Sequence, residues 1–311
     1  MEQQKNSITQ PKFKESFKKK FTEFHDKNYK KLLIIPIILI LLSLVYMGVF
    51  YSQNGDFFRK DISLTGGTSI TINNKINSID LRNSISDKLE DVNIREISDL
   101  ITKEEIAVIV ETRSDESLTR QVLEDYLGYE LTNENSSFEF TGSTLSGNFY
   151  TQLLLSLLIA FALMSIVVFI QFRSLVPSIA VIFSAFADIL MTLVLINILG
   201  IEISGAGIVA LLMLIGYSVD TDILLTNKVL RRHGKSINSK IFDSFKTGIT
   251  MTSTSFFAVL LALIIVGSFS SILYQIFLIM TIGLCFDVLN TWLTNVSIIK
   301  WYAIRKNEIK N

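Results

Sequence analysis

The chain has 311 residues, of which 49% are apolar and only 19% are charged, with three Pro and a single Cys. The apolar content excludes an intrinsically disordered chain, and one Cys excludes a disulfide scaffold. Two His and one Cys, far apart in the sequence, also argue against a zinc site. The charges cluster near the N-terminus and between residues 52 and 149, whereas long windows elsewhere carry none. The sequence therefore predicts an α-helical membrane protein.

The apolar windows are long enough for six membrane spans. A helix needs about 20 mainly apolar residues to cross about 30 Å of hydrocarbon. The uncharged window between Lys246 and Asp287 is too long for one helix, and turn-type residues at 267–271 divide it. The spans are expected at 32–51, 150–172, 174–199, 204–227, 249–266 and 272–299. They leave tails at 1–31 and 300–311 and a large segment at 52–149.

The charge distribution predicts the orientation of these spans. Residues 1–31 hold nine Lys against four acids, and the loop at 228–248 holds six basic residues against one acid. Residues 52–149 hold nine basic and eighteen acidic residues, a net charge of −9. Because cytoplasmic segments are rich in Lys and Arg, both termini are expected in the cytoplasm and residues 52–149 outside the cytoplasmic membrane. The long basic lead favours a signal anchor over a cleaved signal peptide.

The outer segment has the pattern of a small α+β domain. Its periodicity predicts strand, helix, strand, strand, helix and strand at 63–73, 79–89, 92–100, 106–112, 118–126 and 137–141. This order is typical of a ferredoxin-like fold. Gly66 and Gly67 open the first strand, and two interpretations of them stay open. They form a turn or bulge that needs positive φ, or a site where another chain's backbone approaches closely.

Four acids lie inside the expected spans, namely Asp188, Asp220, Asp222 and Asp287, and no Lys or Arg shares a span with them. A carboxylate at a helix centre costs roughly 2.5–3.5 kcal/mol. Three explanations are open: the acids are protonated, they face a hydrated cavity, or they pair with cations on a partner chain. A simpler alternative is that Asp188 and Asp287 are structural hydrogen-bonding groups.

Helical spacing indicates which faces carry these acids. Asp188 and Asp287 each lie in a row of small or polar side chains. Asp220 and Asp222 point about 200° apart, so they cannot share one seam. The polar rows on the third, fourth and sixth spans predict a seam in the bundle interior or toward a second subunit. The fifth span carries a stripe suited to close helix contact, formed by Thr250, Thr254, Ala258 and Ala262.

Several motifs carry a family resemblance. They are Leu64 to Thr68 (Leu-Thr-Gly-Gly-Thr), Phe169 to Val176, Ala187-Asp188, and Ile215 to Asp222. With the arrangement of one span, an acidic outer domain and five further spans, they resemble SecF-type members of the SecD/SecF family, within the resistance-nodulation-division (RND) superfamily. The sequence Val-Asp-Thr-Asp at 219–222 resembles that of archaeal-type members.

This resemblance implies an RND-type half with six transmembrane helices and a ferredoxin-like extracytoplasmic domain between helices 1 and 2. It implies an accessory subunit of the Sec translocase that acts with SecD, a SecYE-type translocon and exported polypeptides. Asp220, with Asp222 as second choice, would couple export to the proton gradient, and Asp188 and Asp287 would be its polar neighbours. The outer domain would contact SecD or the emerging polypeptide.

Two other functions are compatible with the sequence. One is a non-energetic assembly or stabilising subunit of the translocase. The other is half of an RND-type exporter of small molecules or lipids, which predicts duplicated spans, and no internal repeat is visible. The sequence contains no phosphate-binding loop and no nucleophile–base motif. We therefore expect no enzymatic activity, no cofactor and no nucleic-acid partner.

Overall fold

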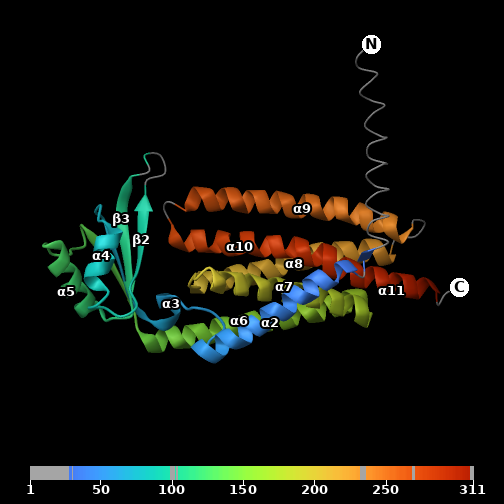
Figure 1. Ribbon diagram of the computed structural model, residues 1–311, viewed down its shortest axis with the longest axis horizontal. Helices are drawn as coiled ribbons and strands as arrows, with labels where there is room; N and C mark the ends of the chain where they lie inside the picture. Colours follow the sequence, from blue (N-terminus) through green and yellow to red (C-terminus); the bar gives the residue numbers. More distant parts are fainter. Residues whose placement is uncertain are drawn as a thin grey trace, which may run out of the picture.

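A computed structural model describes residues 28–29, 31–98, 102, 104–231, 236–267 and 270–308. Most of the tail expected at 1–31 lies outside these residues, as do parts of the loop at 228–248 and of the turn at 267–271. The described residues include six helices that are long and apolar enough to cross a membrane. Figure 1 shows them as one elongated bundle with a small α+β domain at one end. This arrangement confirms the predicted fold class.

Helix α2 (Ile34–Asn54) is the first span and stops at Gly55, which adopts φ 74° and donates its N–H to the carbonyl of Tyr51. A left-handed glycine is a common helix stop, because it has no Cβ to clash. The following spans are α6 (Ser143–Phe172), α7 (Leu175–Ile198), α8 (Gly205–Arg231) and α9 (Ile237–Val266). The last span consists of α10 (Ser271–Leu289), the π-helical turn η1 (Asn290–Asn295) and α11 (Val296–Glu308).

Helix α9 begins well before the apolar window that marked it in the sequence. Ser236 caps its start, since the Ser236 side chain accepts a hydrogen bond from the N–H of Ser239. Lys228 of α8 then donates to the hydroxyl of Thr247 at 2.7 Å, and Lys240 donates to the carbonyl of Val229 at 3.2 Å. The start of this helix therefore depends on a cap and on lysine contacts, which hydropathy does not detect.

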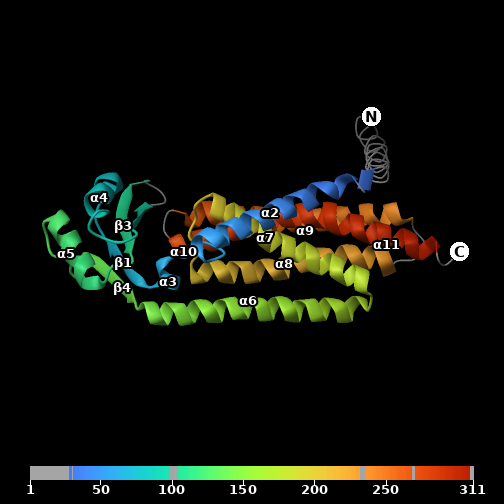
Figure 2. The ribbon, with the colours of Figure 1, turned by 60° about the horizontal axis from the view of Figure 1, so that its bottom comes forward.

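The outer domain contains α3 (Ile62–Thr65), α4 (Ser78–Ile85) and α5 (Glu116–Leu127) beside a four-stranded sheet. The strands β1 (Gly67–Ile72), β2 (Asn93–Ser98), β3 (Glu105–Thr112) and β4 (Ser136–Thr141) have the spatial order β2-β3-β1-β4. All neighbouring strands are antiparallel, as the ferredoxin-like order requires. Helices α4 and α5 cover the face that turns away from the bundle (Figures 1 and 2).

The bundle is built around α7 and α8, whose apolar windows are 61% and 56% buried, against 6% for α6. Figure 2 shows α6 lying along one side of the bundle. At the outer end, Phe58 and Leu64 from the segment after the first span pack into an apolar cluster with Ile203 and Leu211. The segment between the first span and the sheet is therefore fastened to the bundle.

Candidate functional site in the membrane core

Three of the four intramembrane acids converge in the bundle interior. Asp188 of α7 and Asp222 of α8 are fully buried, and Asp287 of α10 is 1% exposed. Helix α7 packs against α8, and α10 packs against both. The interior seam expected from the polar rows is therefore present, and it brings together carboxyl groups from three helices.

The carboxyl group of Asp188 is held by two uncharged donors. The hydroxyl of Ser218 on α8 donates to its Oδ2 at 2.5 Å, and the amide of Asn290 on η1 donates to its Oδ1 at 2.7 Å. Asp188 and its two donors are buried, and so is Thr192, which lies one helical turn further along α7. Asp188 therefore links α7 to α8 and to the last span.

The carboxyl group of Asp222 is tied to the same turn of the last span. Its Oδ1 accepts hydrogen bonds from the hydroxyl of Thr291 at 2.8 Å and from the amide of Asn295 at 2.7 Å. The same Thr291 hydroxyl lies 3.2 Å from Oδ1 of Asp287. A hydroxyl has one proton to donate, so Thr291 either shares that proton between the two carboxyl groups or donates to one and accepts from the other in its protonated form.

The π-helical turn η1 explains how the last span reaches two acids together. Asn290 and Asn295 are five residues apart, and an ordinary α-helix would turn them about 140° away from each other. The i→i+5 hydrogen bonds of a π-turn widen the helix and bring such residues closer to one face. Asn290 therefore reaches Asp188 while Asn295 reaches Asp222. Single π-turns are frequent at functional sites.

The donors to these three carboxyl groups, among the described residues, are uncharged side chains. Several buried oxygens beside them have no hydrogen-bond partner in that part of the chain, namely Ser184 Oγ, Asp222 Oδ2, Thr226 Oγ1, Asp287 Oδ2 and Asn295 Oδ1. A carboxyl group contacted only by neutral donors binds or releases a proton without breaking an ion pair. The arrangement is therefore chemically suited to proton exchange inside the membrane.

Asp220 does not belong to this cluster, which corrects an expectation from the sequence. Asp188 and Asp287 neighbour Asp222 rather than Asp220, because the face of α8 that carries Ser218 and Asp222 turns toward α7 and α10. Asp220 lies on the opposite, exposed face of α8. The angular separation of the two acids was readable from the sequence, but which face points inward was not.

Gly66 and Gly67 lie at a close approach within this chain. Their φ angles are +85° and +147°, which L-residues with a side chain rarely adopt. A Cβ on Gly66 would lie 2.6 Å from Cα of Ser143, and one on Gly67 would lie 2.3 Å from the carbonyl oxygen of Thr112. The requirement for positive φ and the close approach are therefore both present, and the approaching backbone is this chain's own.

Two features of the last span were missed by sequence reasoning. Hydropathy and charge patterns do not single out Asn290, although an amide within an apolar span is itself a signal. Lys300 was placed beyond the span, whereas the helix continues through it and leaves it 1% exposed, with its Nζ 4.9 Å from the ring centroid of Tyr29. Since an apolar window ends at the first charge, it could not show that the helix continues.

Comparison with known proteins assigns the family. The family model described as "Protein export membrane protein SecD/SecF, C-terminal" matches residues 121–305. The protein-export membrane protein SecF of Methanocaldococcus jannaschii is 38% identical over 89% of this chain and 96% of its own length. That of Pyrococcus furiosus is 33% identical over 95% of this chain and 98% of its own length.

A solved structure shares the fold. The crystal structure of SecDF from Thermus thermophilus, described as a translocon-associated membrane protein, matches with a TM-score of 0.70 at 19% identity. The match covers 89% of this chain but only 38% of the SecDF chain. The structural match shows the fold, and the matches in sequence show that the chain belongs to the SecD/SecF family of protein-export membrane proteins.

Proposed function

We propose that the chain is an accessory subunit of the Sec protein translocase and acts with SecD to promote export of polypeptides across the cytoplasmic membrane. The family assignment and the names of the SecF relatives support this proposal. The chain corresponds to 38% of the length of the SecDF chain, which supports a SecD partner that supplies the remainder. The proposal assigns no enzymatic step to the chain.

The proposal places both termini in the cytoplasm and residues 52–149 outside. The end of α8, the start of α9 and the end of α11 lie at the end of the bundle opposite the α+β domain (Figure 1). That end carries Lys228, Lys240, Arg305 and Lys306, as the enrichment of basic residues on the cytoplasmic side predicts. The α+β domain would then face polypeptides that emerge from a SecYE-type translocon.

The exposed face of α8 is the proposed contact with SecD. A carboxylate that faces lipid near the middle of a span is costly, so Asp220 needs a partner that brings a cation or a hydrogen-bond donor. Gly216, one turn away, has open space around it. On the neighbouring α9, Thr250 and Thr254 are also exposed. Small residues of this kind let helices from two subunits approach closely.

The buried carboxyl groups of Asp188, Asp222 and Asp287, contacted by neutral donors, are the observation on which proton coupling rests. Proton transfer among them would change which contacts of Thr291 are hydrogen bonds, and with them the position of η1 against α7 and α8. Both α8 and α10 reach the outer end of the bundle, where the α+β domain is attached. A shift of η1 would therefore have a direct mechanical route to that domain.

The test compares the wild-type chain with Asp188→Asn and Asp222→Asn in membranes that also contain SecD. We expect each variant to slow export several-fold, to keep SecD on purification and to lose sensitivity to a protonophore. A third variant carries both substitutions. If it exports at the wild-type rate with normal protonophore sensitivity, proton coupling through these acids is ruled out.

A second candidate is a non-energetic assembly subunit, favoured by the hydrogen bonds that Ser218, Asn290 and Asn295 make to the acids. Networks of this kind also stabilise helix packing in membranes. In that case the same variants would lose SecD or fall in thermal stability, and the export that remained would respond to the protonophore as in wild type.

A further inference from the structure

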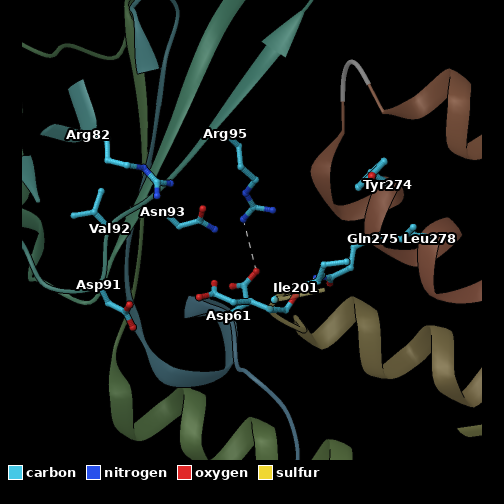
Figure 3. A pocket seen from close by; sticks show the side chains of 12 residues that line it. Asp61, Arg82, Asp91, Val92, Asn93, Arg95, Ile201, Tyr274, Gln275 and Leu278 are labelled. Atoms are coloured by element: carbon cyan, nitrogen blue, oxygen red, sulfur yellow. Dashed lines mark hydrogen bonds and ion pairs between the residues drawn. The ribbon is translucent and has the colours of Figure 1, made fainter. Parts of the chain in front are cut away.

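The junction between the outer domain and the bundle contains a charged pocket that the proposed function does not use. The pocket measures about 380 Å³ and lies between β2, the turn joining α7 to α8, and the start of α10. Figure 3 shows Arg95 reaching from β2 toward Asp61 across this space. The charged side chains that line it are Asp61, Arg82, Asp91, Arg95 and Glu202.

The two chain connections between the domain and the bundle lie at one side of the sheet. The chain enters the sheet at Gly66-Gly67 and leaves it through Gly142 into α6, and these two connections touch, since Gly66 packs against the backbone of Ser143. Both connections belong to β1 and β4, at one side of the sheet. Strand β2 forms the opposite edge. The geometry is that of a hinge with a free edge at β2.

The segment that faces this free edge is fixed to the bundle. The N–H of Ile203 donates to the carbonyl of Arg59 at 2.7 Å, and the N–H of Asp61 donates to the carbonyl of Ile203 at 3.1 Å. The side chain of Gln275 on α10 accepts from the N–H of Ser204 at 3.0 Å and donates to the carbonyl of Glu202. These hydrogen bonds therefore hold the segments that carry Asp61 and Glu202 to the bundle.

Arg95 stands between carboxylates of the two bodies. Its guanidinium forms an ion pair and hydrogen bond with Glu111 on the neighbouring strand β3. Its Nη2 lies 3.7 Å from Oδ2 of Asp61 on the fixed segment, and its buried Nε has no hydrogen-bond partner among the described residues. Arg95 thus contacts acidic side chains on both sides of the pocket, and the pocket has more acidic than basic side chains.

The acids here are sensitive to their surroundings. Burial raises the pKa of Glu111, against the opposing effect of Arg95. Burial also raises the pKa of Glu202, and repulsion from Asp61, Asp91 and Glu111 adds to the rise. Among the described residues, further ionisable groups around the pocket and the adjoining face of the sheet are Arg59 beside Gly200, Arg82 on α4, Tyr274 on α10, Glu139 on β4 and Arg113, which pairs with Asp91 at 2.9 Å.

We propose that this junction is a pH-responsive latch, in which Arg95 holds the free β2 edge against the bundle and protonation of Glu111 and Glu202 tightens the hold. Closing the junction buries these acids, whereas opening it returns them to water. The closed form therefore binds protons more strongly than the open form, and by linkage acid on the outer side favours closure. Once Glu111 is neutral, Arg95 is free to pair with Asp61 across the pocket.

The test measures the distance between the α+β domain and the helical bundle in the full chain in lipid nanodiscs. Spin labels are placed at Lys88→Cys on the domain and Ile198→Cys at the outer end of α7, both exposed positions, after Cys285→Ser removes the native thiol. Between about pH 5 and about pH 8, a range that spans ordinary and raised carboxyl pKa values, we expect the closed population to fall several-fold. A distance distribution that does not change over this range overturns the proposal.

Matched variants assign the response. Glu111→Gln with Glu202→Gln should stay closed across the range, and Arg95→Gln should be open throughout. Glu96→Gln is the control, because Glu96 is exposed on the same strand β2 and should leave the wild-type response intact. A pH response that persists in the double variant contradicts the proposed latch. The measurement involves neither SecD nor export, so its outcome is independent of the proposed function.

Discussion

The amide nitrogen of Asn295 lies 2.7 Å from Oδ1 of Asp222, although 73 residues separate the two in the chain. Both side chains are fully buried. The contact connects the π-turn of the last span to the centre of α8, and its donor cannot neutralise the carboxyl group. The contact therefore couples the position of the π-turn to the protonation state of Asp222, which makes this pair the first target for mutation.

Asn295→Ala should destabilise the chain, because it leaves a buried carboxyl oxygen with one donor fewer. Loss of one partner of a buried hydrogen bond costs about 1–3 kcal/mol, to be measured as a lower thermal unfolding temperature in nanodiscs. Thr254→Ala is the matched control. Its hydroxyl is exposed and bonds to its own helix at 2.7 Å, so a change within about 0.5 kcal/mol is expected. Equal shifts in both variants would contradict this account of the buried network.

Asp220→Asn and Asp222→Asn should have different consequences, although the residues are two positions apart. Asp222 is buried among donors of the last span, so its replacement should lower protonophore-sensitive export and leave SecD bound. Asp220 is exposed on α8, so its replacement should lower the amount of SecD that copurifies. Both are measured in the same membranes, by export assay and by affinity purification. The reverse pattern would mean that the two faces of α8 have been assigned wrongly.

Gly67→Ala should disrupt the start of β1. Its φ is +147°, and a Cβ there would lie 2.3 Å from the carbonyl oxygen of Thr112. Strain and displacement of β3 together should cost about 3 kcal/mol or more. Gly128→Ala is the control, since its φ is +74° but no atom lies within 4 Å, and a cost of about 1–2 kcal/mol is expected. Hydrogen exchange of β1 and β3 amides separates the two, and similar protection in both variants would argue against the clash.

Glu202→Gln should stabilise the folded chain at alkaline pH. The pKa of Glu202 is raised above its usual value of 4.5, mainly by burial, so the folded state binds this proton more strongly than the unfolded state does. Stability from this group is therefore lost as pH rises through the folded pKa. The difference in unfolding temperature between variant and wild type should be positive at about pH 8 and vanish toward pH 4.5. Glu96→Gln should show no such trend, and a parallel trend there would point to a general charge effect.

The fold could be predicted to a large extent because its signals are local. Long, mainly apolar windows located the spans, and residue periodicity indicated the order of strands and helices in the outer domain. The ends of the helices were less predictable. The start of α9 depends on the Ser236 cap, and the continuation of the last helix places Lys300 inside the protein. The Ser236 cap produces no change in hydropathy, and Lys300 lowers the hydropathy at a point where the helix continues.

The sequence by itself determined that carboxyl groups lie in membrane-spanning helices and that Asp220 and Asp222 face apart, because helix geometry sets the angle between residues on one chain segment. Tertiary structure alone decided which of them meets Asp188 and Asp287. That choice depends on the rotation of α8 against α7 and α10 and on the π-turn at Asn290–Asn295. Both arise from packing between helices distant in sequence, so no local pattern of residues records them.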